Sequence, residues 1–187
     1  MDSFLCVAIT PDSVTDQNII EELWAEGLDY LYWRKTDVLT QPPPIHHPNK
    51  ILLASSQPTS YLWHLKEKDQ QVLPVNQRAF STSIHQLSDW PLWTNKVDLV
   101  FYSPVFESIS KPGYGPVLSL TTIEYQLKKL RSEGENLPKI VALGGVHQGN
   151  IAAVQQSGFD GAALMGSLWN NENPANALRE LRQQLKL

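Results

Sequence analysis

The sequence of 187 residues has a single cysteine, no long apolar run and no excess of basic residues, and each absence excludes a class of protein. Cys6 cannot form an internal disulfide, and its place in the apolar run of residues 4–9 indicates core packing rather than nucleophilic chemistry. The first residues lack the basic and then apolar pattern of a secretory signal, and no stretch is long enough to cross a membrane. We therefore expect a cytoplasmic protein without membrane contact.

The charge balance argues against a polyanionic partner. The formal net charge is −4, so the chain has no global basic surface for nucleic acid or an anionic membrane. With 42% hydrophobic residues the chain can bury a sizeable core, and we expect a single domain over residues 1–187. An anionic ligand must then be met by a local pocket, and a homo-oligomer is compatible with the sequence.

Short apolar runs recur along the whole chain and alternate, in its later part, with helical patterns. Eight strands are predicted, at residues 4–9, 29–35, 51–54, 61–65, 79–84, 97–102, 140–143 and 162–165, with residues 72–75 competing for the fourth. Helices are predicted near residues 19–24, 120–133, 149–156 and 174–185. Alternating strands and helices favour a parallel sheet.

The early crossovers lack helical patterns. Residues 39–50 contain four prolines and cannot form a normal helix. The pattern predicts an α/β fold, a small (β/α)8 TIM barrel with some early crossover helices missing or shortened, and an open doubly wound sheet is the alternative. Four tryptophans beyond the needs of a small core are expected to cover the open faces or to lie in a subunit contact: Trp63, Trp90, Trp93 and Trp169.

Two segments carry anion-binding patterns. After the predicted strand 97–102, a loop gathers hydroxyls, a lysine and glycines, with Ser108, Ser110 and Lys111 at its centre. The diglycine Gly144-Gly145 follows the next strand, and Met165-Gly166 follows the last one. Glycine lets backbone N–H groups approach an oxyanion, so these strand ends predict a phosphate site at the carboxyl edge of the sheet.

These segments, in this order, resemble the thiamine phosphate synthase/TenI family over nearly the whole chain. The strongest match is Pro104-Val-Phe-Glu-Ser-Ile-Ser-Lys-Pro112, which is similar to the Pro-Val-Phe loop of that family with its hydroxyl residues and lysine. Further matches are Trp33-Arg34-Lys35, Ser83-Ile-His85, Ala142-Leu-Gly-Gly-Val146 and Gly158-Phe-Asp-Gly-Ala-Ala163.

The resemblance assigns roles to the matching residues. It implies that Gly144, Gly145 and the backbone of Met165 and Gly166 hold the phosphate of a thiazole ethyl phosphate. It implies that five side chains face the second substrate or its pyrophosphate: Arg34, Ser83, Ser108, Ser110 and Lys111. Fixed positive charge and hydroxyl donors are what a leaving pyrophosphate requires.

The chain departs from the family at the magnesium ligands. The synthases carry an Asn-Asp pair after strand three, where this chain has Ala54-Ser-Ser56. Their His-Leu-Gly-Gln-x-Asp motif becomes His64-Leu-Lys-Glu-Lys-Asp69, so Asp69 is the one candidate ligand, with the cationic Lys66 and Lys68 nearby. The resemblance therefore favours the tautomerase branch, which needs no metal and places a histidine after strand five, here His85.

Three interpretations stay open. The favoured one is an enzyme that binds a thiazole phosphate and moves a proton with His85, with Lys111 and Arg34 as further catalytic candidates. The alternative is thiamine phosphate synthase, which joins a pyrimidine pyrophosphate to the thiazole phosphate and for which Mg²⁺ is possible. A non-catalytic binder of thiazole phosphate, or a barrel using its phosphate site for another sugar or indole phosphate, completes the set.

Overall fold

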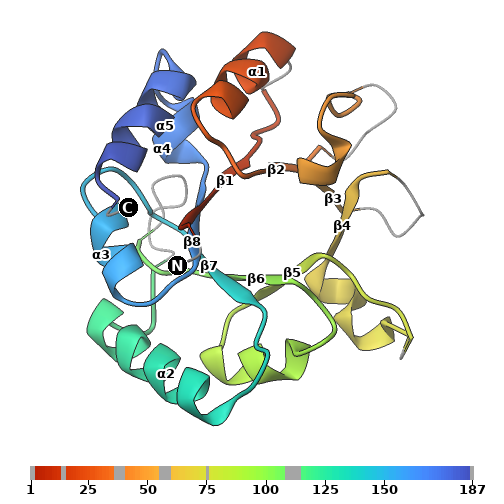
Figure 1. Cartoon of the computed structure of the whole chain (residues 1–187), viewed down its shortest axis with the longest axis vertical. Helices are drawn as coiled ribbons and strands as arrows, with labels where there is room; N and C mark the ends of the chain where they lie inside the picture. The colour runs from red at the N-terminus through yellow and green to blue at the C-terminus, as the bar shows by residue number, and fades with distance from the viewer. Residues whose placement is uncertain are drawn as a thin grey trace.

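Eight parallel strands close into a barrel in chain order, with β8 pairing β1 (Figure 1). The structure, a computed structural model, describes residues 3–13, 16–35, 41–54, 60–74, 76–107 and 115–185. The strands are β1 (Leu5–Ile9), β2 (Tyr30–Trp33), β3 (Ile51–Leu53), β4 (Leu62–Leu65), β5 (Ser81–Ile84), β6 (Leu99–Tyr102), β7 (Lys139–Leu143) and β8 (Gly161–Leu164). The predicted (β/α)8 barrel is confirmed, and the open-sheet alternative is wrong.

Helices cover the barrel unevenly, as Figure 1 shows. The α-helices are α1 (Gln17–Ala25), α2 (Leu120–Glu133), α3 (Ile151–Gln156), α4 (Gly166–Trp169) and α5 (Pro174–Gln183). Between β2 and β6 the described residues form only 3-10 helices: η1 (Pro48–Lys50), η2 (Glu67–Val72) and η3 (Leu87–Trp93). The early crossover helices are therefore missing, as predicted, and Val72 ends η2 instead of opening the competing fourth strand.

Sequence signals at the helix ends explain where three of the α-helices begin. The side chains of Asp16, Ser119 and Asn173 each accept a backbone N–H of the first turn of α1, α2 and α5, respectively. Such caps satisfy amides that have no partner within the helix. The helical crossovers are thus fixed by local sequence as well as by their packing on the barrel.

Alternate strand residues separate the two layers of the core. The barrel interior contains Val7, Leu52, Phe101 and Val141, whereas their neighbours in sequence face the outer layer. This alternation follows from the two-residue period of a strand. Both layers are close to fully buried, so the closed sheet is a filled scaffold rather than a pore.

Tryptophan packing closes part of the helix-poor side. Trp90 of η3 is fully buried, and its Nε1 donates to the carbonyl oxygen of Pro138 at 2.9 Å. Trp33 at the end of β2 is also buried and donates to the carbonyl of Gln41 at 3.0 Å. Trp90 and Trp33 are thus buried on the side where the described crossovers contain no α-helix.

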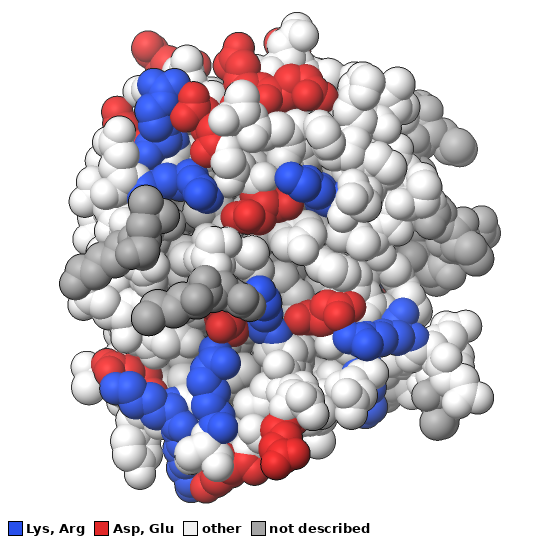
Figure 2. Space-filling view, viewed as in Figure 1, with Lys and Arg blue, Asp and Glu red and all other residues white. Residues whose placement is uncertain are grey.

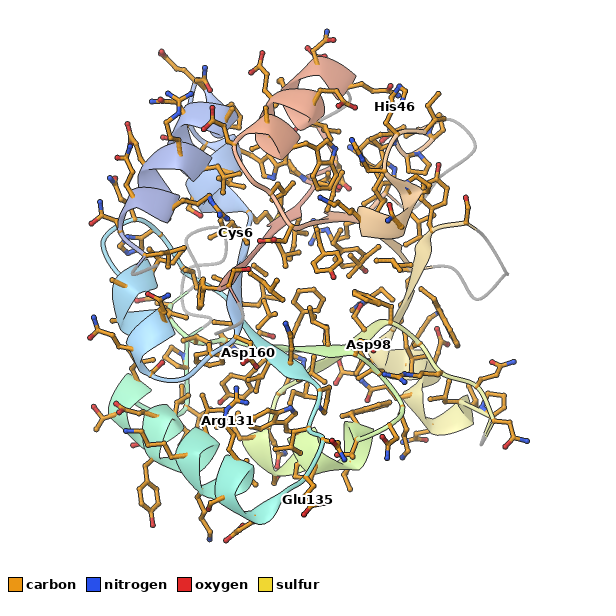
Figure 3. All side chains as sticks on the ribbon, viewed as in Figure 1. Cys6, His46, Asp98, Arg131, Glu135 and Asp160 are labelled. Atoms are coloured by element: carbon orange, nitrogen blue, oxygen red, sulfur yellow. The ribbon has the colours of Figure 1, made fainter. Side chains whose placement is uncertain are left out.

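Carboxylates join neighbouring strands at the amino ends of the barrel. Asp29 accepts the backbone N–H of Cys6 at 2.8 Å, and Asp160 accepts that of Ile140 at 2.7 Å. Figure 3 shows Asp160 beside Arg131 of α2, whose Nη2 lies 2.8 Å from its carboxylate. Stabilising contacts thus occupy this end, while the predicted site residues follow the opposite, carboxyl ends.

Surface charge gives no sign of a polyanion-binding face in the view of Figure 2, where acidic and basic side chains are interspersed. None of the helices in the described ranges is long and apolar enough to cross a membrane. Cys6 is fully buried, and burial raises the pKa of its thiol to about 11. A thiol that stays protonated is a poor nucleophile, which confirms its role in the core.

Candidate functional site

The carboxyl ends of β7 and β8 lie side by side. The two strands are paired in parallel, with Ala142 opposite Ala162 and Leu143 opposite Ala163. Gly144-Gly145 and Met165-Gly166 follow directly on these paired strands, so the structure brings all four of these predicted phosphate-binding residues to one edge of the barrel. That they hold a phosphate stays a prediction.

The diglycine is also required by close packing. Gly144 and Gly145 have φ angles of +102° and +64°, which residues with a side chain rarely adopt. A Cβ atom on Gly145 would lie 2.7 Å from the Cβ of Phe106 and would also overlap the carbonyl of Glu107. The two glycines therefore let the segment after β6 cross directly over the end of β7, a reason that the sequence analysis did not give.

His85 is held firmly at the end of β5. Its Nδ1 lies 2.7 Å from the carbonyl oxygen of Ser103, which can only accept, so Nδ1 carries the proton. In the neutral ring Nε2 is then the basic atom, and it lies 3.4 Å from a carboxylate oxygen of Glu67. The next residue, Gln86, is the N-cap of η3.

One short segment, residues 103–107, connects the histidine to the diglycine. At its start Ser103 accepts the hydrogen bond from His85, and further along Val105 and Phe106 donate to the carbonyls of Leu143 and Gly144 at 3.0 and 3.1 Å. His85 and the predicted phosphate-binding edge thus belong to one continuous set of contacts. Ser108, Ser110 and Lys111, predicted in the loop that follows, lie outside the described residues.

Arg34 and Ser83 lie where the sequence predicts them, at the carboxyl ends of β2 and β5. Arg34 is exposed, and its backbone N–H donates to the hydroxyl of Thr10 at 3.0 Å. Ser83 is half-buried. The neighbouring Lys35 is buried instead, where its ammonium binds the carbonyls of Pro11 and Asp12, and burial lowers its pKa. Lys35 therefore fixes the loop after β1, while Arg34 can meet a ligand.

His64 belongs to the floor of the site rather than to its acid–base groups. Its Nδ1 lies 2.9 Å from the hydroxyl of Ser81, and its ring packs against Tyr32 and Phe101 inside the barrel. Burial, with a smaller contribution from Lys66, lowers its pKa to about 4. The ring is therefore neutral at physiological pH.

Asp69 is poorly placed for a magnesium ion. It lines a cavity of about 450 Å³ on the outer side of β4, shared with Trp63, Leu65, Lys66 and Lys68. Trp63 and Leu65 belong to the layer outside the barrel, and His64 between them also lines this cavity. No group of three His, Cys, Asp or Glu gathers anywhere in the described ranges, and a single carboxylate that shares its cavity with Lys66 and Lys68 does not suit Mg²⁺. The described residues therefore do not fit the metal.

The sequence analysis missed two residues of the site, Glu67 and Ser103. Glu67 stands two positions beyond β4, where the family motif has glutamine, and that departure at a strand end was the available signal. Ser103 contributes mainly its backbone carbonyl, at 2.7 Å from Nδ1, with its hydroxyl farther away at 3.4 Å. A backbone acceptor has no residue-type signal, so only the fold could reveal it.

Comparison with known proteins gives one family. Residues 58–168 match the family model described as thiamine monophosphate synthase. The thiamine-phosphate synthase of Listeria innocua serovar 6a is 25% identical over 126 residues, which are 64% of this chain and 56% of the relative. That of Actinobacillus pleuropneumoniae serotype 7 is 29% identical over 125 residues, 63% of this chain and 55% of the relative. The chain thus spans about half the length of the curated relatives it matches.

Among solved structures, the thiamine phosphate pyrophosphorylase of Bacteroides thetaiotaomicron superposes with a TM-score of 0.69. The superposition covers 97% of this chain and 96% of that one at 23% sequence identity. At this identity the likeness shows the shared barrel fold and leaves the chemistry to the residues of the site.

Proposed function

Because the chain belongs to the thiamine monophosphate synthase family, we propose that it binds a thiazole phosphate and catalyses a step of thiamine biosynthesis. The observation that carries this proposal is the adjacency of the glycine-bearing ends of β7 and β8, joined to His85 through residues 103–107. Backbone amides at such strand ends suit a phosphate monoester. The predicted cytoplasmic location and a possible homo-oligomer stay predictions.

For the reaction we propose the condensation that yields thiamine phosphate, in place of the tautomerase favoured by the sequence. The names of the matching relatives support it. In this reaction the thiazole nitrogen attacks the methylene carbon of a pyrimidine pyrophosphate, whose carbon–oxygen bond breaks to release pyrophosphate. Arg34 and Lys111 would stabilise the negative charge that builds on the leaving group.

The test is pyrophosphate release from purified protein mixed with both substrates, with and without Mg²⁺. We expect release that requires both substrates and falls at least about tenfold in Lys111→Met, since fixed charge acts on the leaving group. Lys128→Met is the matched control, because Lys128 pairs with Glu124 on the outer helix α2. Absence of release under both conditions would exclude the condensation.

A second candidate is proton transfer that aromatises a thiazole carboxylate phosphate, and the anchoring of His85 supports it. With Nδ1 bound to Ser103, Nε2 is available to take a proton from a ring carbon and return it elsewhere on the same substrate. The ultraviolet spectrum of the substrate tautomer should then change, and the change should be strongly slowed in His85→Ala. Tight binding of thiazole phosphate without turnover in either assay would instead identify a non-catalytic binder.

A further inference from the structure

We propose that Glu67 is a positioning residue for His85, holding Nε2 at the mouth of the barrel while the ring carries and returns a proton. The inference rests on the second candidate of the proposed function, because it assumes that His85 transfers a proton to or from the bound substrate. It assigns a role to a carboxylate that follows a different strand from the histidine.

Glu67 lies on the face of the 3-10 helix η2 that packs against β5. A 3-10 helix has three residues per turn, so Glu67 and Gln70 lie on one face. Gln70 donates to the hydroxyl of Thr82 at 2.9 Å and to the carbonyl of Ser83 at 2.7 Å, which fixes that face against β5. Glu67 is thereby directed to His85, two residues beyond Ser83.

The opposite face of η2 carries the other charged residues of the segment. Lys66 and Asp69, also three residues apart, line the outer cavity together with Lys68. From β6 the group packed against His85 is Ser103, which is uncharged. In the described ranges Glu67 is therefore the one charged residue that the structure pairs with the imidazole.

The two contacts hold the protonated ring from both nitrogens, whereas the neutral ring is held through Nδ1 alone. Ser103 fixes Nδ1 as the protonated atom, which leaves Nε2 to exchange the proton. When Nε2 takes a proton, its N–H can donate to Glu67, so the charged ring keeps the orientation of the neutral one. The side chains of His85 and Glu67 are 42% and 64% exposed, so water screens the attraction and orientation is the larger effect. Exposure also leaves Nε2 within reach of a ligand.

A double-mutant cycle tests the proposal. We expect Glu67→Gln to lower kcat about 3- to 30-fold with little change in KM, and Glu67→Asp to restore part of the loss. In the His85→Ala background Glu67→Gln should have no further effect, because the residue acts through the histidine. Asp69→Asn on the cavity face of η2 is the matched control, and its effect on kcat should be equal with and without His85. Equal effects of Glu67→Gln in both backgrounds would overturn the proposal.

A measurement without turnover separates this proposal from the proposed function. The ring-nitrogen NMR signals of His85 should show Nδ1–H as the neutral tautomer and should shift in Glu67→Gln but not in Asp69→Asn. If no turnover is detected but the NMR signals of His85 shift in Glu67→Gln and not in Asp69→Asn, the proposed function is wrong and the contact between Glu67 and His85 is confirmed. If the enzyme is active and the signals ignore Glu67, the positioning role is wrong.

Discussion

The two halves of the barrel are closed by different means. From β6 through β8 to β1, α-helices pack on the outside, and the sheet ends in the glycine-bearing ends of β7 and β8. From β2 to β5 the described covering consists of 3-10 helices and buried tryptophans. The first half presents the backbone predicted to bind phosphate, whereas the second carries the side chains of Arg34, Ser83, His85 and Glu67.

This difference indicates that the two halves of the barrel contribute different kinds of group to the predicted site. Backbone groups that must meet a phosphate need a rigid support, which helices packed along the strands provide. Ionisable side chains at the mouth need only a fixed strand end and a partner that orients them. A short crossover such as η2 brings such a partner close to the strand. The small size of the chain is thus compatible with a complete set of site residues.

The largest effect should come from Trp90, which replaces a helix in the second half. Trp90→Ala leaves a cavity and frees the carbonyl of Pro138, so we expect the free energy of unfolding to fall by about 3–5 kcal/mol. Denaturant unfolding followed by circular dichroism measures it. Trp90→Phe keeps an aromatic ring but removes the five-membered ring of the indole with its N–H, so it should lose less, about 1–3 kcal/mol. A loss below about 1 kcal/mol in Trp90→Ala would show that η3 contributes little to closure.

The second largest effect is expected at Gly145, in the half of the barrel that runs from β6 to β1. Gly145→Ala should lower the free energy of unfolding by about 2–4 kcal/mol and weaken thiazole phosphate binding, because the methyl group displaces residues 103–107. Calorimetry gives the binding constant. Gly158→Ala separates clash from backbone strain, since Gly158 has φ of +95° but nothing within 4 Å of an added Cβ. Equal losses in both variants would mean that the close crossing is unimportant.

The smallest expected effect is the pH dependence of the free energy of unfolding that comes from His64, in the β2–β5 half of the barrel. The native ring has a pKa of about 4, whereas in the unfolded chain it binds a proton near pH 6.5. Between these values the unfolded state holds more protons, so stability falls as the pH drops from about 6.5 to 4, by up to about 3 kcal/mol. Stability curves of wild type and His64→Gln should converge at the acid end. Parallel curves would contradict the burial of a neutral imidazole.

Most of the fold could be predicted from local pattern. The apolar runs mark the eight strands, and capping residues such as Ser119 and Asn173 mark helix starts. The 3-10 helices η2 and η3 and the four-residue α4 were not predicted, because segments this short have too few residues for a periodic signal. Residues 39–50 showed by their prolines alone that a crossover helix was missing.

The candidate site could be predicted only in part. Gly144 and Gly145 were found from their residue type at a strand end, whereas Arg34 and His85 were found from the resemblance to the family. Asp69 was chosen by its place in the motif, yet in the structure it lines the outer cavity, and Glu67 is the carboxylate at the histidine. Glu67 and Asp69 are two residues apart in the 3-10 helix η2 and therefore face different sides. No sequence pattern predicted where η2 lies.

The sequence by itself determined which residues form strands, how many there are and what chemical groups stand at their ends, since these depend on period and residue type. Only the tertiary structure decided which of those groups meet. The contacts of His85 with Ser103 and Glu67, and the crossing of residues 103–107 over Gly145, join strands distant in the chain. They follow from barrel closure, which sets parallel strand ends side by side whatever their separation in sequence.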